Sequence, residues 1–165
     1  MGGGERRSVV VRILALDAGN TTGTALWTPD GLVLGKVVGR AMAYQLLQTV
    51  EDLDAFAFER FVIRQGLQEK YADVVYINGA VEAEAYRRGI PAFGYTSTDT
   101  KSPRSTRRVT DQMLKDCGWW PGFGLRTGGH AADAARVLYL TLKENYPQEF
   151  PACQIPPKTS TFQTN

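Results

Sequence analysis

The sequence predicts a single domain of the α/β class, with a mixed five-stranded sheet and helices on both of its faces. Three observations lead to this prediction. The chain has 165 residues, a length that suits one domain with a core of its own. Its first 39 residues contain three apolar runs separated by turn residues, the pattern of an antiparallel meander. Beyond them, short apolar runs alternate with segments of helical periodicity, which favours parallel strands joined through helices.

The three strands of the meander come first. Residues 8–17 form a β-branched run that ends on Asp17, and the turn residues AGNTTG follow it. Residues 24–39 contain two further strands, separated by Pro29, Asp30 and Gly31. These residue types let the backbone reverse tightly. Strands in such close succession are therefore expected to pair antiparallel.

Two helices and two strands follow in alternation. In chain order we expect a helix at 41–50, a strand at 54–60, a helix at 71–88 and a strand at 90–96. Strands that are reached through helices join a sheet in parallel. The first and fourth strands would then lie side by side. Their carboxyl ends, which carry Asp17 and Glu59, would meet.

Two helices and a tail complete the predicted order. A helix at 102–118 is indicated by Ser102 and Pro103, which are typical of a first turn. An alanine-rich amphipathic run predicts the last helix at 128–143. From Tyr146 onward, four prolines and no periodicity predict an extended tail. We therefore expect a folded domain at 9–145, a flexible N-terminus at 1–8 and the tail at 146–165.

The net charge indicates no particular partner, whereas the cysteine content bears on the cellular compartment. The 19 basic and 17 acidic residues give a net charge of +2, which by itself indicates no acidic or basic partner. Cys117 and Cys153 share no CxxC spacing, which predicts two thiols rather than a disulfide and a cytoplasmic protein. No run approaches ~18 apolar residues, and the start MGGGERR lacks the apolar core of a signal peptide. Membrane insertion and secretion are therefore not expected.

Three acids and a histidine carry the functional prediction. Asp17 and Glu59 close neighbouring strands, while His130, the only histidine, lies one turn before Asp133 on the last helix. Acids this close raise one another's pKa unless a cation lies among them. Carboxylates with one imidazole suit Mg²⁺ or Mn²⁺, and two such ions can hold the attacking and leaving oxygens of a phosphodiester. The four residues therefore predict a divalent metal site.

Each of the four also has a structural interpretation. Asp17 suits a turn, Glu59 suits a solvated strand end, and Asp133 is favoured by the helix dipole. His130 could cap its helix, and within a catalytic site it could be either a metal ligand or a proton-transfer group. The topology, which brings all four to one place, favours the shared site.

Three segments resemble the catalytic segments of the RuvC family of Holliday-junction resolvases, especially its phage-encoded branch, within the ribonuclease H-like superfamily. They are ILALDAGNTTGTALW, AFAFERF and GGHAADAARVLYL, and their order and spacing match from about residue 11 to residue 143. The resemblance implies a ribonuclease H-like sheet and a Mg²⁺-dependent hydrolase that cuts branched DNA in recombination and repair. Asp17, Glu59 and Asp133 match the family's first-strand, fourth-strand and last-helix acids. At His130, many bacterial members have a further aspartate and others a histidine.

The resemblance also implies contacts with junctions, forks or flaps. Lys101 is similar to a basic residue near the family's active site, and the segment after it corresponds to one that contacts DNA. On the predicted helix, this segment carries a basic stripe suited to phosphates, made of Arg104, Arg108 and Lys115, with Arg107 beside it. Family members pair, because cutting a symmetric junction takes two active sites. A homodimer is therefore implied, although no stripe of this sequence identifies an interface.

Three aromatic residues have two interpretations each. Phe61 lies where the family's junction-contacting loop begins, so it is either an apolar wedge against unstacked bases or a core residue. Trp119 and Trp120 could stack on bases, but neighbouring aromatics in a loop more often cover the edge of a core. We assign Phe61 to the DNA-binding residues and the two tryptophans to the core.

Two other functions compete with the nuclease. The run DAGNTTGTALW also resembles the first phosphate-binding motif of the actin, Hsp70 and sugar-kinase superfamily, which indicates an ATP-binding kinase or ATPase. That fold needs two such domains and a second phosphate motif, whereas this chain has the length of one domain and no second copy. The other alternative is a catalytically silent DNA-binding relative. The complete set of four candidate ligands argues against it.

Overall fold

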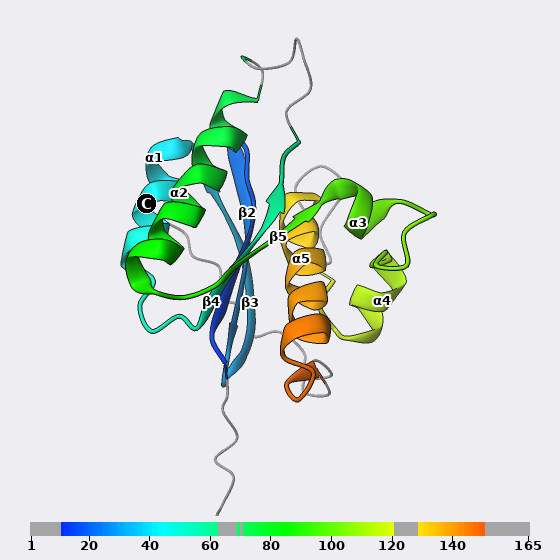
Figure 1. Ribbon diagram of the computed structural model, residues 1–165. Coiled ribbons are helices and arrows are strands. Elements are labelled where there is room, and N and C mark those ends of the chain that lie inside the picture. Colours follow the sequence, from blue (N-terminus) through cyan, green and yellow to red (C-terminus); the bar gives the residue numbers. More distant parts are fainter. Residues whose placement is uncertain (1–10, 63–68, 70, 121–128, 151–165) are drawn as a thin grey trace, which may run out of the picture.

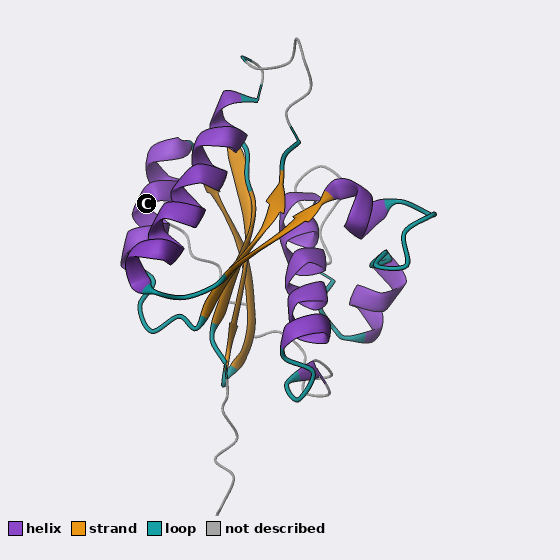
Figure 2. Cartoon of the chain, in the orientation of Figure 1, coloured by secondary structure: helices purple, strands orange, loops and turns teal. Residues whose placement is uncertain are grey.

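The computed structural model describes residues 11–62, 69, 71–120 and 129–150. Within these ranges the chain forms five strands and five helices in three layers (Figure 1). Helices α1 (Arg40–Thr49) and α2 (Ala72–Arg88) cover one face of the central sheet, and α5 (Gly129–Asn145) covers the other (Figure 2). No helix among the described residues is long and apolar enough to cross a membrane.

The sheet has the predicted mixed topology. Its strands lie in the order β3-β2-β1-β4-β5, with bounds Ile13–Asp17 for β1, Thr21–Thr28 for β2, Gly31–Val38 for β3, Ala55–Arg60 for β4 and Ala92–Thr96 for β5. The first three strands pair antiparallel, while β4 joins β1 in parallel and β5 joins β4 in parallel. The predicted meander and the predicted contact between the first and fourth strands are both confirmed.

The alternation of side chains along β1 and β4 determines the face of the sheet to which Asp17 and Glu59 point. Successive strand residues point to opposite faces, and here each face has its own apolar core. On the α1 and α2 side lie Leu14, Leu16, Phe56 and Phe58. On the α5 side lie Ile13, Ala15, Ala55 and Ala57. Asp17 and Glu59 continue this second row, so both carboxylates are directed to the face that α5 covers.

Small residues let α5 lie close to the sheet. The helix buries Ala131, Ala132, Ala134 and Ala135 in its first turns, opposite the alanines of β1 and β4. At its very start, α5 meets Gly23 of β2. A Cβ on Gly23 would overlap the backbone of His130 and Ala131. This glycine therefore permits the approach that brings the first turn of α5 over the acid-bearing end of β1.

Gly23→Ala is expected to destabilise the protein by about 1–3 kcal/mol, the usual cost of overpacking a close contact. The first turn of α5 must move away from β2 to admit the methyl group. Gly79→Ala on α2 is a matched control, because a Cβ there has no neighbour within 4 Å and alanine favours helix by about 1 kcal/mol. Urea unfolding measures both. Wild-type stability in Gly23→Ala would contradict the close approach.

The predicted helix at 102–118 is wrong over residues 102–110 and holds only for α4 in its second half. The structure has α3 at Ser97–Lys101, turns through 102–110, and α4 at Asp111–Asp116. Thr96 begins α3 with a capping box completed by Asp99. Pro103 disfavours helical angles at the residue before it, and Ser102 accordingly leaves the helix with ψ at 132°. Thr110 caps a new helix, α4. The proline ends one helix instead of starting another.

The C-terminal tail differs from the prediction over its first five residues. Residues 146–150 form turns instead of an extended segment, and Tyr146 and Phe150 pack against the α5-side core. The Phe150 ring meets Tyr139 edge-on with centroids 4.9 Å apart. The folded unit thus extends at least to Phe150. The rest of the predicted tail, the predicted N-terminal segment at 1–8 and Cys153 lie outside the described residues.

Candidate functional site

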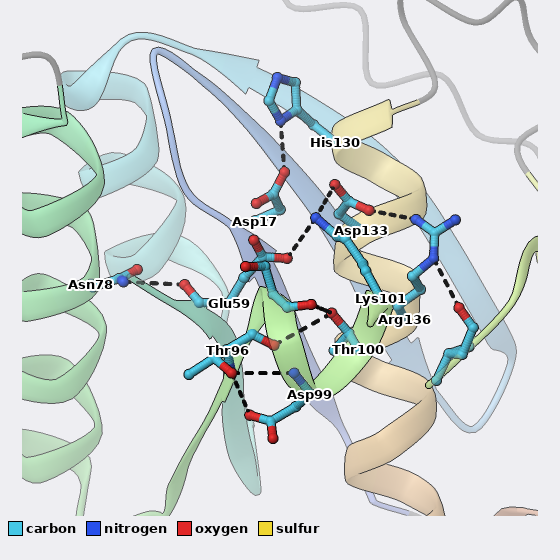
Figure 3. A network of polar contacts seen from close by, with 12 residues as sticks. Asp17, Glu59, Asn78, Thr96, Asp99, Thr100, Lys101, His130, Asp133 and Arg136 are labelled. Atoms are coloured by element: carbon cyan, nitrogen blue, oxygen red, sulfur yellow. Dashed lines mark hydrogen bonds and ion pairs between the residues drawn. The ribbon is translucent and has the colours of Figure 1, made fainter. Parts of the chain in front are cut away.

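Three carboxylates converge where β1 and β4 end against α5. Asp17 is the last residue of β1, Glu59 is the penultimate residue of β4, and Asp133 lies on the second turn of α5. Each offers a carboxylate oxygen, and these oxygens lie within 4.8 Å of one another (Figure 3). We call these residues the acidic triad. The juxtaposition predicted from the sequence for these three acids is present in the fold.

Lys101 lies inside the triad and bridges two of its members. Its Nζ atom is 2.7 Å from Asp133 Oδ2 and 3.0 Å from Glu59 Oε2 (Figure 3). Burial alone would lower the pKa of Lys101, but the hydrogen bond to Asp133 and the charge of Glu59 outweigh it and raise that pKa. The ammonium therefore stays charged and offsets part of the repulsion within the triad. The structure thus places Lys101 in direct contact with two acids of the triad.

His130 contacts the remaining acid. Its Nδ1 atom lies 2.6 Å from Asp17 Oδ2, and about half of the imidazole is exposed. Among the described residues, the group of mutually close ligand atoms comprises the triad without His130. The geometry thus joins His130 to the site through Asp17. Its role as a metal ligand stays a proposal.

Burial and a neighbouring carboxylate disfavour the ionised form of Asp17. Burial and the adjacent charge of Glu59 raise the pKa of Asp17 from 3.8 to about 6, against the lowering effect of the His130 hydrogen bond. Three carboxylates supply the hard oxygen ligands that Mg²⁺ and Mn²⁺ prefer. A divalent ion would also stabilise the ionised form of Asp17. The residues present therefore fit a divalent metal centre.

The metal-free protein is expected to lose stability as pH rises through this range. Below pH 3.8 Asp17 is protonated in both the folded and the unfolded chain, and above about 6 it is ionised in both. In between, only the folded chain keeps the proton, so folding is progressively penalised, by about 3 kcal/mol in all. Asp17→Asn should therefore unfold like wild type near pH 4 and be more stable at pH 7.5. Urea unfolding in EDTA measures this, and a difference that does not depend on pH would contradict it.

Two further residues support the triad and were not predicted. Asn78 of α2 donates from Nδ2 to the backbone carbonyl of Glu59 at 3.1 Å. Arg136, one turn after Asp133 on α5, pairs with the Asp133 carboxylate (Figure 3). The (i, i+3) spacing of Asp133 and Arg136 is visible in the sequence. The contact of Asn78 with β4 follows from tertiary packing and has no sequence pattern of its own.

A groove of about 400 Å³ opens beside the triad, and we call it the triad groove. Asp17 and Glu59 line one end of it, and its other walls include Phe61, Val62, Tyr71 and Val74. The Phe61 ring lies 4.6 Å from that of Tyr71, centroid to centroid. Phe61 therefore faces a groove and is not part of the apolar cores, as its wedge interpretation requires.

The predicted basic stripe is not a single helical stripe, because its three arginines lie on turns and Lys115 lies on α4. Arg104, Arg107 and Arg108 are all exposed within residues 102–110, which we call the basic segment. Arg107 is engaged by the protein itself, because its Nε atom lies 2.8 Å from Glu144. Arg108 instead lines a second groove, of about 540 Å³, together with Lys101, Lys115 and Arg136. We call this the side groove, and the structure connects it to the triad through Lys101.

The tryptophans lie as the core interpretation predicts. Trp119 is fully buried, and its ring centroid is 5.6 Å from that of Trp27. Trp120 packs against the same core from its edge, with Lys115 Nζ 5.1 Å from its ring centroid. Cys117 is buried beside them.

Solved structures of RuvC and of a mitochondrial Holliday junction resolvase resemble the chain. RuvC of T. thermophilus, in complex with a Holliday junction substrate, superposes with a TM-score of 0.56 at 20% identity, covering 85% of this chain and 97% of that one. The yeast mitochondrial Holliday junction resolvase Ydc2 has a TM-score of 0.53 at 15% identity, covering 87% of this chain and 83% of that one. No family model and no curated protein sequence matches the chain. The chain therefore has the ribonuclease H-like fold of RuvC-type resolvases, as the resemblance of its sequence predicted.

Proposed function

We propose that this chain is a divalent-metal-dependent endonuclease that hydrolyses phosphodiesters of branched DNA, like a Holliday-junction resolvase. The observation that carries the proposal is the acidic triad, whose carboxylates meet within 4.8 Å at the ends of β1 and β4 and on α5. The fold supports it, because RuvC, solved in complex with a Holliday junction substrate, and the Holliday junction resolvase Ydc2 have similar structures. The presence of a buried acidic cluster on this fold argues against a silent relative.

The chain's own residues have distinct parts in such a site. Asp17, Glu59 and Asp133 would hold Mg²⁺, for which Mn²⁺ is expected to substitute, with His130 as a proposed fourth ligand. A bound ion supplies Lewis-acid charge to the phosphodiester and lowers the pKa of water, and two ions would serve both reacting oxygens. His130 fixes Asp17 through its Nδ1 atom. Lys101 keeps a positive charge beside the position that a phosphate would occupy.

The surface around the triad fits a branched DNA strand. The triad groove presents Phe61 next to the acids, and an apolar ring at a branch point can press against an unstacked base. The side groove presents Arg108 and Lys115 to phosphates on the other side of Lys101. We propose that Phe61, Lys101, Arg104 and Arg108 contact the DNA. Arg107 contributes less, since Glu144 and Asp99 compete for its guanidinium.

The double variant Arg104→Ala, Arg108→Ala is expected to weaken junction binding and flatten its salt dependence. The slope of log K against log salt should fall by up to ~0.9 for each phosphate that the variant no longer neutralises. Arg107→Ala should change the slope less, because its ion pair with Glu144 already holds the side chain. Fluorescence anisotropy in EDTA, over a range of salt concentrations, measures both. A double variant with the wild-type slope would remove these residues from the interface.

Cleavage of labelled substrates tests the proposal. Four-way junction, flap, duplex and single-stranded DNA are incubated with protein in Mg²⁺, in Mn²⁺ and in EDTA. We expect cuts in branched DNA that require the metal and that Asp17→Asn, purified identically, does not make. Binding without cleavage on every substrate would indicate the catalytically silent relative. ATP binding by calorimetry with no affinity for DNA would indicate the ATPase alternative.

A four-way junction as substrate also bears on how many copies of the protein bind to it. Symmetric cleavage of a four-way junction takes two active sites, so we propose a homodimer on the DNA. Sedimentation of the protein with and without junction measures the number of copies per junction. One copy per junction, with cuts in a single strand, would contradict this proposal while leaving the nuclease intact.

A further inference from the structure

Arg136 is the most completely engaged cation near the triad. Its side chain is 12% exposed, and all three of its guanidinium nitrogens have partners. Nη1 pairs with Asp133 Oδ1 and Nη2 pairs with Asp111 Oδ1, while Nε donates to the carbonyl of Val109 at 3.1 Å. These partners lie on α5, on α4 and at the end of the basic segment.

The two oxygens of Asp133 are thereby given different surroundings. Oδ1 is held by Arg136 on the outer side, and Oδ2 lies 2.7 Å from Lys101 Nζ on the side of Glu59 (Figure 3). An (i, i+3) ion pair on a helix surface fixes a carboxylate only weakly. Here the guanidinium is itself anchored on Val109 and Asp111, outside α5. The direction of the Asp133 carboxylate is therefore set by a residue that other elements hold in place.

We propose that Arg136 is a positioning residue for Asp133, which it orients so that Oδ2 is the oxygen offered to a divalent ion. The proposal rests on the proposed function, since it assigns Asp133 as a metal ligand. Residues that hydrogen-bond to metal-ligating carboxylates typically account for 10–100-fold in metal affinity or activity. Arg136 does not itself face the triad groove.

The same guanidinium connects the metal ligand to the basic segment. Val109, whose carbonyl accepts from Arg136, directly follows Arg108 in the side groove. A shift of the basic segment would therefore move the Asp133 carboxylate, because the rigid, planar guanidinium of Arg136 contacts both. This connection explains why an arginine suits the position better than a lysine. The three donors of an ammonium share one nitrogen, whereas the guanidinium reaches its three acceptors from three separate nitrogens.

Arg136→Lys separates geometry from charge. It keeps the positive charge near Asp133 but loses the planar guanidinium that also reaches Val109 and Asp111. We therefore expect the affinity for Mg²⁺, measured by calorimetry without DNA, to weaken about tenfold or more. The kcat for junction cleavage should fall while the KM for DNA stays unchanged. Arg136→Met should also bind Mg²⁺ more weakly. If Arg136 acts only through its charge, Arg136→Met will instead bind Mg²⁺ more tightly and Arg136→Lys will match wild type, and either result overturns the proposal.

Arg88 provides the matched control. Its side chain is similarly buried, at 15% exposed. Far from the triad, its guanidinium also donates from three nitrogens, to Glu84 and to the carbonyls of Leu47 and Val50. Arg88→Lys should lower the thermal midpoint and leave Mg²⁺ affinity and kcat unchanged. If Arg136→Lys behaves the same way, Arg136 is a structural residue and the proposal is wrong. Wild-type protein that binds no Mg²⁺ overturns the proposed function as well, so the two failures are distinguishable.

Discussion

Asp17→Asn, Glu59→Gln and Asp133→Asn are each expected to lose more than ~100-fold of junction cleavage, which exceeds the usual effect of altering an outer-shell partner. Each exchange keeps the shape of the side chain and removes one negative charge from a group whose carboxylate oxygens lie within 4.8 Å of one another. Binding of junction DNA in EDTA should persist or tighten, because negative charge facing phosphates is removed. Single-turnover cleavage and anisotropy measure the two effects separately.

Stability distinguishes a missing ligand from a disrupted fold. Asp17→Asn removes a carboxylate charge whose burial and repulsion by Glu59 raise the pKa of Asp17 to about 6. This variant should therefore be inactive and yet more stable than wild type at neutral pH. Glu82→Gln is the matched control, because Glu82 is exposed on α2 and pairs only loosely with Arg60, at 3.8 Å. It should cleave normally. Normal cleavage by Glu59→Gln would instead show that the acid of β4 is not part of the centre.

The acids of the triad were predictable because strands have a simple period. Asp17 and Glu59 each follow an apolar run, and parallel neighbours bring such ends together at one edge of the sheet. Asp133 was predictable from its helical position relative to His130. These inferences need only the order of elements and their periodicity. The mixed sheet and the position of the triad followed from them.

Contacts between distant elements were not predictable in the same way. The basic segment was mistaken for a helix because Ser102 and Pro103 also occur at helix starts, and only the capping boxes at Thr96 and Thr110 assign the boundaries. Arg136 carries no signal beyond its spacing from Asp133, since Val109 and Asp111 meet it only after folding. Arg107 resembled its neighbours in sequence, but Glu144 on α5 draws it away from them.

His130→Ala is expected to lower cleavage by about 10–100-fold, the range for losing a histidine that binds or orients a metal site. The imidazole Nδ1 lies 2.6 Å from Asp17 Oδ2, so a neutral ring that donates there leaves Nε2 with a lone pair. Such a ring can orient Asp17, bind the ion or accept a proton from water. Comparing Mg²⁺ with Mn²⁺ adds a second readout, because Mn²⁺ tolerates poorer coordination and should partly restore His130→Ala.

His130→Asp decides between these roles. A carboxylate at this position faces Asp17 with no proton to share, and it is tolerated only if a cation binds between the two side chains. We therefore expect His130→Asp to be inactive in EDTA and to keep substantial cleavage in Mg²⁺, as a ligand replaced by another ligand would. If His130→Asp is as inactive as His130→Ala in Mg²⁺ while both bind junction DNA normally, the ligand role is wrong, and His130 acts by orienting Asp17 or in proton transfer.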